Sequence, residues 1–138
     1  MKNTYLKTGL KTTVLLTAFA ISFTGCSSYK RTSSPSPIHQ QQTKLGSVLT
    51  DSSAMTLYTF DKDRPNVSNC NNGCAAKWPP LFVGNQGNAN KRFSVITRAD
   101  NSKQWAFDSK PLYRWFKDKK SGDTTGDGIK SVWHVAKP

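Results

Sequence analysis

One short phrase occurs twice in this chain and sets the frame for its fold. The first copy runs from Leu57 to Asp63 and the second from Leu112 to Asp118. Both read Leu, Tyr, any residue, a large aromatic, two further residues and Asp. In a strand, Tyr and the second aromatic share one face and Leu takes the other. Each copy therefore predicts a β-strand that runs into a polar turn, and the pair predicts two related hairpin units.

The Asp that ends each phrase lies beyond the expected end of the strand, where its carboxylate can accept hydrogen bonds from turn N–H groups. We therefore expect this Asp to be structural and the two tyrosines to occupy equivalent positions. The repeat residues singled out in this way are Tyr58, Phe60, Asp63, Tyr113, Trp115 and Asp118.

The rest of the pattern predicts a mainly β fold, a small antiparallel sheet or sandwich. Strands are expected over residues 46–50, 55–61, 92–97, 104–107 and 131–136. A short helical turn is expected near Cys74–Trp78, where the following Pro79 and Pro80 would end it. All eight acidic residues are Asp, which favours turns, and the chain is rich in aromatics, which favour strands.

The N-terminus has the pattern of a bacterial lipoprotein signal peptide over residues 1–25. Lysines precede a short apolar run, and small residues then lead to Cys26. Cys26 is the expected site of lipidation, which would carry palmitate or a similar acyl chain and anchor the protein. By the usual sorting rule for such lipoproteins, Ser27 points to the outer membrane, facing the periplasm or the surface.

Residues 26–44 are expected to form a disordered tether, because Ser, Pro and Gln dominate and almost nothing there is apolar. His39 would then be a solvated linker residue. Residues 45–138 are expected to form the β-rich repeat domain.

The region from about residue 46 to 136 resembles a family of bacterial lipoproteins with the signature Y-x-[FWY]-x-x-D, a secreted repeat of unknown function. Besides the two phrases, the resemblance rests on Thr50-Asp51, Cys70, Cys74-Ala75, Trp78-Pro79-Pro80-Leu81, Gly126-Asp127-Gly128 and Val132-Trp133-His134-Val135. The chain departs from the family at Ala54-Met55, where Gly-Met is expected, which puts a glycine-dependent turn in question. The resemblance implies no reaction.

Cys70 and Cys74 remain once Cys26 is set aside, and an exported protein sits where disulfides persist. We expect them to form a structural bridge that fixes the turn presenting Trp78. A redox role is less favoured, because the spacing is not C-x-x-C.

Two ligand hypotheses are weighed against structural roles. His134 could be an axial haem ligand with Met55 or a Tyr, but a structural His on a strand is more common. The loop holding Asp118, Asp123 and Asp127 could bind calcium, but Asp-Gly pairs also make turns. We predict no metal and no cofactor.

The aromatic side chains are expected to form mostly core, with part of them exposed as a platform. The candidate ligand contacts are Trp78, Trp105 and His134. A net charge of +12 and basic residues around the second phrase predict contact with an anionic envelope polymer or lipid, through Lys110, Arg114, Lys117, Lys119 and Lys120. The export signal argues against nucleic acid.

Together these features predict a membrane-anchored envelope lipoprotein that is a non-enzymatic binding or structural module, with no catalytic residues. The alternative is a haem- or redox-associated accessory lipoprotein that uses His134 and the Cys70/Cys74 pair.

Overall fold

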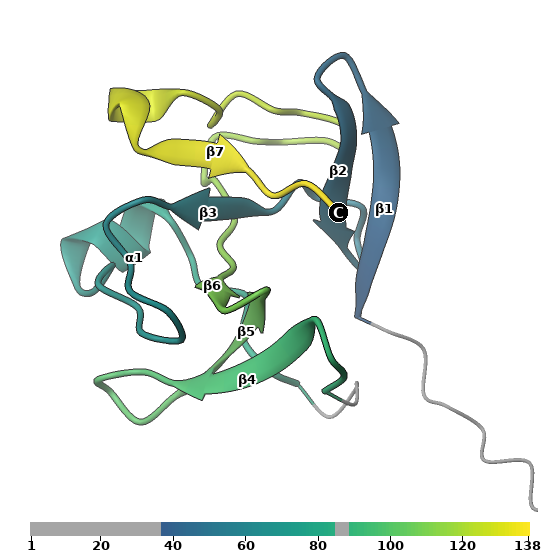
Figure 1. The fold of residues 1–138 in the computed structure, drawn as a ribbon. Coiled ribbons are helices and arrows are strands. Elements are labelled where there is room, and N and C mark those ends of the chain that lie inside the picture. The colour runs from purple at the N-terminus through teal and green to yellow at the C-terminus, as the bar shows by residue number, and fades with distance from the viewer. Residues whose placement is uncertain (1–36, 85–88) are drawn as a thin grey trace, which may run out of the picture. The chain divides into compact units, whose positions relative to one another are not determined.

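The computed structural model describes residues 37–84 and 89–138 and confirms a mainly β fold (Figure 1). Contacts along the chain make Thr32–Pro138 a compact unit of its own. Its elements, in chain order, are β1 (Ile38–Thr43), β2 (Gly46–Asp51), β3 (Tyr58–Phe60), α1 (Gly73–Lys77), β4 (Phe93–Thr97), β5 (Lys103–Phe107), β6 (Lys110–Pro111), the 3-10 helix η1 (Ile129–Ser131) and β7 (Trp133–Val135).

The strands form small antiparallel sheets: β1 pairs with β2, β3 with β7, and β5 with both β4 and β6. The two related hairpins are β1–β2 and β4–β5. The predicted pairing of residues 46–50 with residues 55–61 is retained over a short stretch, where Thr50 bridges Thr56 and the Leu57 amide donates to the carbonyl of Leu49. In the part of the chain that is described, no helix is long and apolar enough to cross a membrane.

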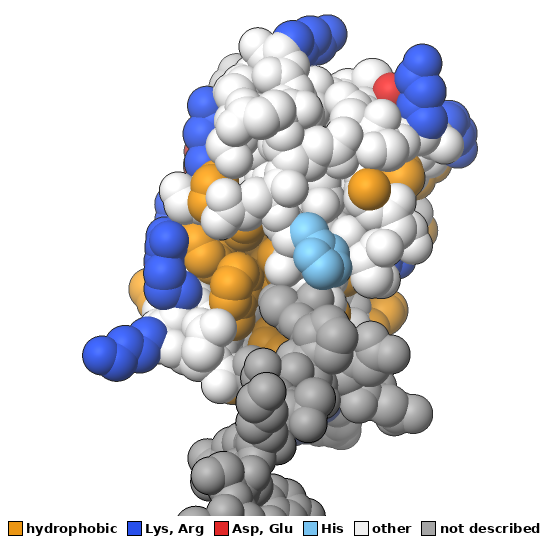
Figure 2. Space-filling view, turned by 90° about the vertical axis from the view of Figure 1, so that its right-hand side faces the viewer, with side chains coloured by type: hydrophobic (Ala, Val, Ile, Leu, Met, Phe, Trp, Pro, Cys, Tyr) orange, Lys and Arg blue, Asp and Glu red, His pale blue; other side chains and the backbone are white. Residues whose placement is uncertain are grey.

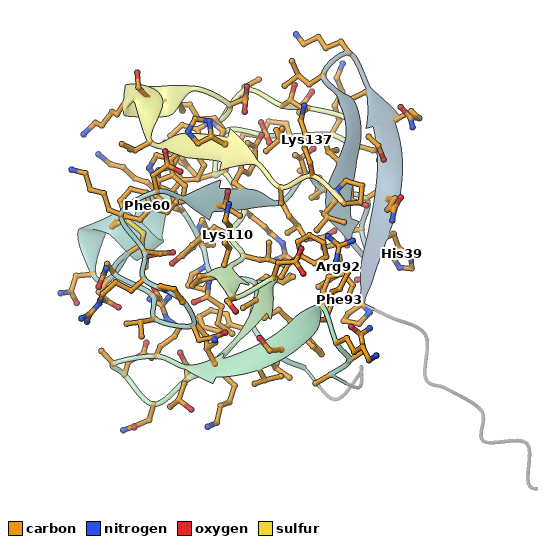
Figure 3. The ribbon with its side chains drawn as sticks, viewed as in Figure 1. His39, Phe60, Arg92, Phe93, Lys110 and Lys137 are labelled. Atoms are coloured by element: carbon orange, nitrogen blue, oxygen red, sulfur yellow. A yellow bond between two sulfur atoms is a disulfide. The ribbon has the colours of Figure 1, made fainter. Side chains whose placement is uncertain are left out.

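Strand β1 corrects the predicted tether, because residues 38–43 are ordered against β2 along their whole length. Only Ile38 in this strand is fully buried, and His39 projects outward from it (Figure 3). A run of Gln and Thr gives no apolar signal of its own, so cross-strand pairing rather than burial explains this strand. The predicted tether is therefore wrong at its C-terminal end. Residues 1–36, with Cys26 and the signal peptide, lie outside the described residues.

The two halves of the domain, residues 37–84 and 89–138, repeat one hydrogen-bond pattern around the leucine of each phrase. The Leu57 N–H donates to the carbonyl of Leu49, and the Leu57 carbonyl accepts from the N–H of Ala136. In the second half Leu112 makes the same two bonds. The equivalent pairs are therefore Leu57 with Leu112, Leu49 with Trp105, and Ala136 with Leu81.

Each half is completed by a segment of the other. The two phrases lie side by side, since Tyr58 and Tyr113 exchange both backbone hydrogen bonds, at 2.8 and 3.0 Å. The first phrase then pairs with β7, at the end of the second half. The second phrase pairs with residues 77–81 of the first half, where the Arg114 and Phe116 amides donate to Pro79 and Lys77. Neither half therefore contains all the partners of its own phrase.

The core consists of two clusters, and each phrase contributes to both. Leu57 and Leu112 lie in one cluster with Trp105 and Phe107, while Tyr58 and Tyr113 lie in the other. All four leucine and tyrosine side chains of the phrases are fully buried. The phrase is thus buried on both faces, and burying aromatic and aliphatic area is what stabilises so small a domain.

The turn before the first phrase keeps its shape despite the departure from the family. Ala54 adopts a φ of 59°, in the left-handed region that glycine occupies readily. Asp51 holds this turn, because its side chain accepts hydrogen bonds from the amides of Ser53 and Met55. The position therefore keeps the conformation of a glycine turn with an alanine in it.

Candidate functional site

Four aromatic rings form a continuous stack at one end of the domain. Phe60 stacks on Trp133 with ring centroids 4.2 Å apart, and Trp133 stacks on Trp78 at 3.8 Å with the planes only 4° apart. Trp115 closes the stack against Trp78 at 4.2 Å. The order alternates between the halves, so neither half alone builds the stack.

The internal repeat determines where these rings lie in the chain. Phe60 and Trp115 hold the same position in the two phrases, and Trp78 and Trp133 follow their tyrosines at the same distance in sequence. The inner rings are almost completely buried, with 4% of Trp78 and 3% of Trp133 exposed, whereas Phe60 and Trp115 are half-buried. Trp78 was predicted to contact a ligand, and most of its surface instead packs in the core.

A groove of about 450 Å³ lies along this stack, and we call it the aromatic groove. It is lined by the four rings and by residues of α1 and of the segment around η1. Cys74 of the first half and Ile129 of the second take equivalent places in the walls. Three exposed lysines complete the lining, namely Lys62, Lys77 and Lys130, and no carboxylate is among the lining residues.

The cystine supports one wall of this groove. Cys70 and Cys74 are bonded, as predicted, and the bridge ties the start of α1 to the loop before it. Cys70 is fully buried in the same cluster as the stack. The Trp78 amide donates to the carbonyl of Cys74, so the bridged turn positions this ring.

All eight carboxylates of the chain are engaged inside the domain. Asp51 pairs with Arg114, Asp61 with His134, Asp63 with Tyr113, Asp100 with Ser102, Asp108 with Arg92, Asp118 with Tyr58, Asp123 with the amides of Lys119 and Lys120, and Asp127 with the amide of Val135. On the face in Figure 2, Lys and Arg side chains project along the margins and little acidic surface is visible. The groove lysines therefore have no carboxylate partner among the described residues.

The phrase aspartates accept hydrogen bonds from across the two halves and not only from their own turns. Tyr58 donates to Asp118 at 2.6 Å and Tyr113 donates to Asp63 at 2.7 Å. Burial and the bond to Asp118 raise the pKa of Tyr58 above its ordinary value. Burial likewise raises the pKa of Tyr113. Each aspartate also accepts the amide of a later loop residue, Asn69 or Thr125, and so closes a loop in its own half.

A buried cation lies near the hydrogen bond between Tyr113 and Asp63. Arg98 is only 5% exposed and donates to Ser68, Gln104 and the carbonyl of Cys70. Ser68 lies 2.8 Å from the Tyr113 hydroxyl. Burial raises the pKa of Asp63, and the Asn69 amide opposes that shift most strongly. The series of hydrogen bonds from Arg98 to Asp63 therefore fixes the loop before α1.

Two predicted ligand contacts lie away from the aromatic groove. Trp105 is 1% exposed and belongs to the other core cluster. His134 lies 2.9 Å from Asp61 and alternates along β7 with Trp133, so it points away from the cluster that holds the cystine. The structure therefore does not bring His134 and the Cys70/Cys74 pair into one site.

The Asp-Gly loop makes internal bonds. Asp118 accepts from Tyr58 and Thr125, Asp123 accepts two loop amides, and Asp127 accepts the amide of Val135. Within residues 37–84 and 89–138, no group of three or more His, Cys or acidic side chains is placed to hold a metal ion.

Sequence reasoning missed the groove lysines and favoured other cations. Neither Lys110, on β6, nor Lys119, which donates to the carbonyl of Phe116, is among the residues that line the groove. A signal for Lys62 was present, because it follows the phrase aromatic by two positions, as Lys117 does in the second copy. Nothing in the sequence pattern indicated Lys77 or Lys130.

A family model described as a secreted repeat of unknown function matches the chain twice, over residues 41–81 and 94–137. The matches fall on the two halves of the domain and together cover more than half of the chain. Comparisons with curated proteins and with solved structures found no match. The chain therefore belongs to the lipoprotein family described as a secreted repeat of unknown function.

Proposed function

We propose that this protein is a non-enzymatic binding module of the bacterial envelope, anchored through Cys26, which holds an acidic polysaccharide in the aromatic groove. The observation that carries the proposal is the lining of that groove: four aromatic rings and three lysines, with no carboxylate. A description as a secreted repeat is consistent with such a module.

The chemistry of the groove favours an acidic sugar chain over a small apolar ligand. Binding sites are mostly apolar, with a few polar groups that fix the ligand, and the half-buried Phe60 and Trp115 offer apolar ring surface to the flat faces of sugars. Lys62, Lys77 and Lys130 are mobile point charges around that surface, suited to carboxylates spaced along a polymer.

A binding role is favoured over catalysis by the same lining. General acid–base chemistry needs a carboxyl, imidazole or similar group poised near neutral pH. The residues that line the groove include no Asp and no His. The groove therefore offers contact area and positive charge rather than a proton relay.

The position of the groove favours a polymer over the anchoring membrane. The described chain begins at Pro37, next to β1, while α1 and the segment of η1 lie at the other end of the domain (Figure 1). A membrane anchor preceding β1 would therefore attach at the end away from the groove.

The test compares binding to alginate, a soluble uronate polymer, and to neutral dextran. Changing Lys62, Lys77 and Lys130 to Gln together should weaken alginate binding by at least about tenfold at low salt, because several charge contacts are lost. The matched control changes Lys44, Lys91 and Lys103 to Gln, which removes the same charge away from the groove.

Binding should also fade once ionic strength passes about 0.15 M, where the Debye length is about 8 Å. Equal loss of alginate binding in both triple variants would show that binding depends on overall surface charge and not on the groove. Tighter binding to vesicles containing phosphatidylglycerol than to alginate would show that the ligand of the groove is a lipid and not a polysaccharide.

Anchoring has its own experiment. Labelled palmitate should be incorporated into the wild-type chain in cells and not into Cys26→Ser, which should also leave the membrane fraction. Equal labelling of the two chains would refute lipidation at this residue without bearing on the groove.

A further inference from the structure

A second pocket, of about 430 Å³, lies where β2 meets the segment after Pro80, and we call it the Arg114 pocket. The side chains that matter in its lining are Asp51, Ser52, Leu81, Phe82, Trp105 and Arg114. It shares no lining residue with the aromatic groove.

An ion pair fixes the cation of this pocket. The Nε of Arg114 lies 2.5 Å from Oδ2 of Asp51, whose side chain is 2% exposed, and the other Asp51 oxygen accepts two turn amides. This carboxylate is thus a buried anchor that holds the guanidinium by one nitrogen. The side chain of Arg114 is 44% exposed, and no hydrogen bond to another described residue occupies its terminal nitrogens. Those nitrogens are therefore available as a two-pronged donor for a carboxylate or phosphate.

Trp105 lines the same pocket and carries an unused donor. Its ring is almost fully buried in the pocket wall, and its Nε1 is buried without a hydrogen-bond partner among the described residues. A buried N–H group without a partner costs free energy, so such groups are uncommon. A ligand oxygen in the pocket could remove that cost.

The remaining wall is apolar and open. Phe82 is 54% exposed, more than any other large hydrophobic residue among those described. Leu81, which precedes it, is a buried member of the first core cluster and also lines the pocket. An exposed aromatic next to a positioned cation is a suitable surface for a ligand with one anionic end and one apolar end.

The other half of the domain shows that the fold does not require these donors. The positions equivalent to Arg114, Asp51 and Trp105 are occupied by Thr59, Phe107 and Leu49. A depression of about 270 Å³ exists there too, lined by Thr59, Phe107 and Lys137 among others. The same backbone geometry therefore exists without the ion pair and without the indole, so the donor set belongs to this pocket and not to the repeat.

We propose that the Arg114 pocket binds a small amphiphile, with a carboxylate or phosphate head against Arg114 and an acyl chain along Phe82 and Leu81. The site is independent of the polysaccharide groove. Two sources share this chemistry, a free fatty carboxylate and the head of an anionic phospholipid.

The experiment measures binding of dodecanoate, below its micelle concentration, by the change in tryptophan fluorescence. The protein is a chain beginning at Ser27, which includes the whole compact unit Thr32–Pro138. Arg114→Gln should weaken binding by at least about tenfold, because a charge-assisted pair of hydrogen bonds is lost. Trp105→Phe keeps an aromatic ring but removes the indole, so it should abolish the fluorescence change. Dodecanol should bind far more weakly than dodecanoate.

Because Arg114→Gln leaves Asp51 buried without its partner, two further variants keep the test decisive. Arg114→Gln with Asp51→Asn removes both charges, and Phe82→Ala changes an exposed ring that the core does not need. Both should lose dodecanoate affinity, whereas Lys137→Gln in the equivalent depression should not. Unchanged affinity in the double variant and in Phe82→Ala, or equal affinity for dodecanol, would overturn the proposal.

Two more arms separate the sources and the sites. Stronger binding of dodecyl phosphate, together with capture by phosphatidylglycerol vesicles, assigns the pocket to lipid heads. Preference for dodecanoate assigns it to free fatty carboxylates. The Lys62, Lys77 and Lys130 triple variant should retain dodecanoate binding, so failure of the polysaccharide groove would leave this proposal standing. No measurable binding of either amphiphile would refute it.

Discussion

The hydroxyl of Tyr58 donates a buried hydrogen bond of 2.6 Å to Asp118, a residue 60 positions later in the chain. The reciprocal bond joins Tyr113 to Asp63 across 50 positions. The tyrosine of each phrase is therefore paired with the aspartate of the other. The signature Y-x-[FWY]-x-x-D describes one of two segments, each of which supplies the tyrosine that bonds to the aspartate of the other. This explains why two copies are needed in one domain.

Removing the hydroxyl with Tyr58→Phe should lower the free energy of unfolding by about 1.5–3 kcal/mol, since the bond is buried and its acceptor is charged. Asp118→Asn should cost less than Asp118→Ala, because Asn keeps an acceptor for Thr125. A double-mutant cycle measured by urea unfolding should show coupling between Tyr58 and Asp118. Additive effects would contradict the pairing, and Asp61→Asn, at an exposed pair, serves as the control.

Alkaline pH should destabilise the domain through the two phrase tyrosines. Their pKa values are raised in the folded state above the value of 10.0 that they take when unfolded. The stabilisation is therefore complete below pH 10 and is lost as pH rises toward the folded pKa. Ultraviolet titration should show their ionisation coinciding with loss of far-ultraviolet circular dichroism. Ionisation of Tyr58 and Tyr113 near pH 10 with the fold intact would contradict this.

Gly126 permits the contact between the loop and the ring stack. A Cβ at this position would lie 2.9 Å from ring atoms of Trp78 and Tyr58, which the core holds in place. Gly126→Ala should therefore lower stability by about 1–3 kcal/mol, as over-packing does. Gly73→Ala, where a Cβ meets nothing within 4 Å, is the matched control in thermal unfolding.

Ala54→Gly should raise the thermal midpoint. Ala54 holds a φ of 59°, and the left-handed conformation costs an L-residue about 1 kcal/mol that glycine does not incur. Greater entropy of the unfolded chain offsets part of this gain. The comparison by calorimetry needs Ala75→Gly in α1 as control, which should lower stability. A lower midpoint for Ala54→Gly would show that the turn carries no strain.

The exchange of segments predicts that the halves fold only together. Fragments of residues 27–86 and 87–138, prepared separately, should each lack most of the native circular dichroism signal, because each phrase has lost its partner strand. Mixing them should restore the signal and the near-ultraviolet bands of the tryptophan stack. Native-like folding of either fragment alone would contradict the reciprocal pairing.

Local pattern was enough for the fold class and for the β4–β5 hairpin but not for the exchange. Alternation along β4 and β5 and the turn residues between them are local properties, so those strands were predicted nearly to the residue. The bond from Tyr58 to Asp118 is set by tertiary pairing, which no window of sequence contains. Strand β1 was missed for the same reason, since its stability comes from β2.

The candidate site was only partly visible in the sequence. The phrase aromatics Phe60 and Trp115 were singled out as repeat residues, and both line the groove. The other tryptophans are buried and offer little surface to a ligand. The sequence could not predict this, because a buried inner ring of a stack and an exposed platform ring have the same local sequence pattern. Lys130, which also lines the groove, lies in a segment around η1 whose backbone takes positive φ values, and the sequence did not predict that conformation.

Strand β1 also limits the distance between the domain and a membrane anchor at Cys26. An anchor at Cys26 would be followed by only the residues up to Pro37 before the chain enters the sheet. Even at full extension, of about 3.5 Å per residue, those residues span no more than about 40 Å, whereas a tether reaching Lys44 would span about 65 Å. The domain would therefore sample a shell close to the bilayer, and a partner polymer would have to come within that distance.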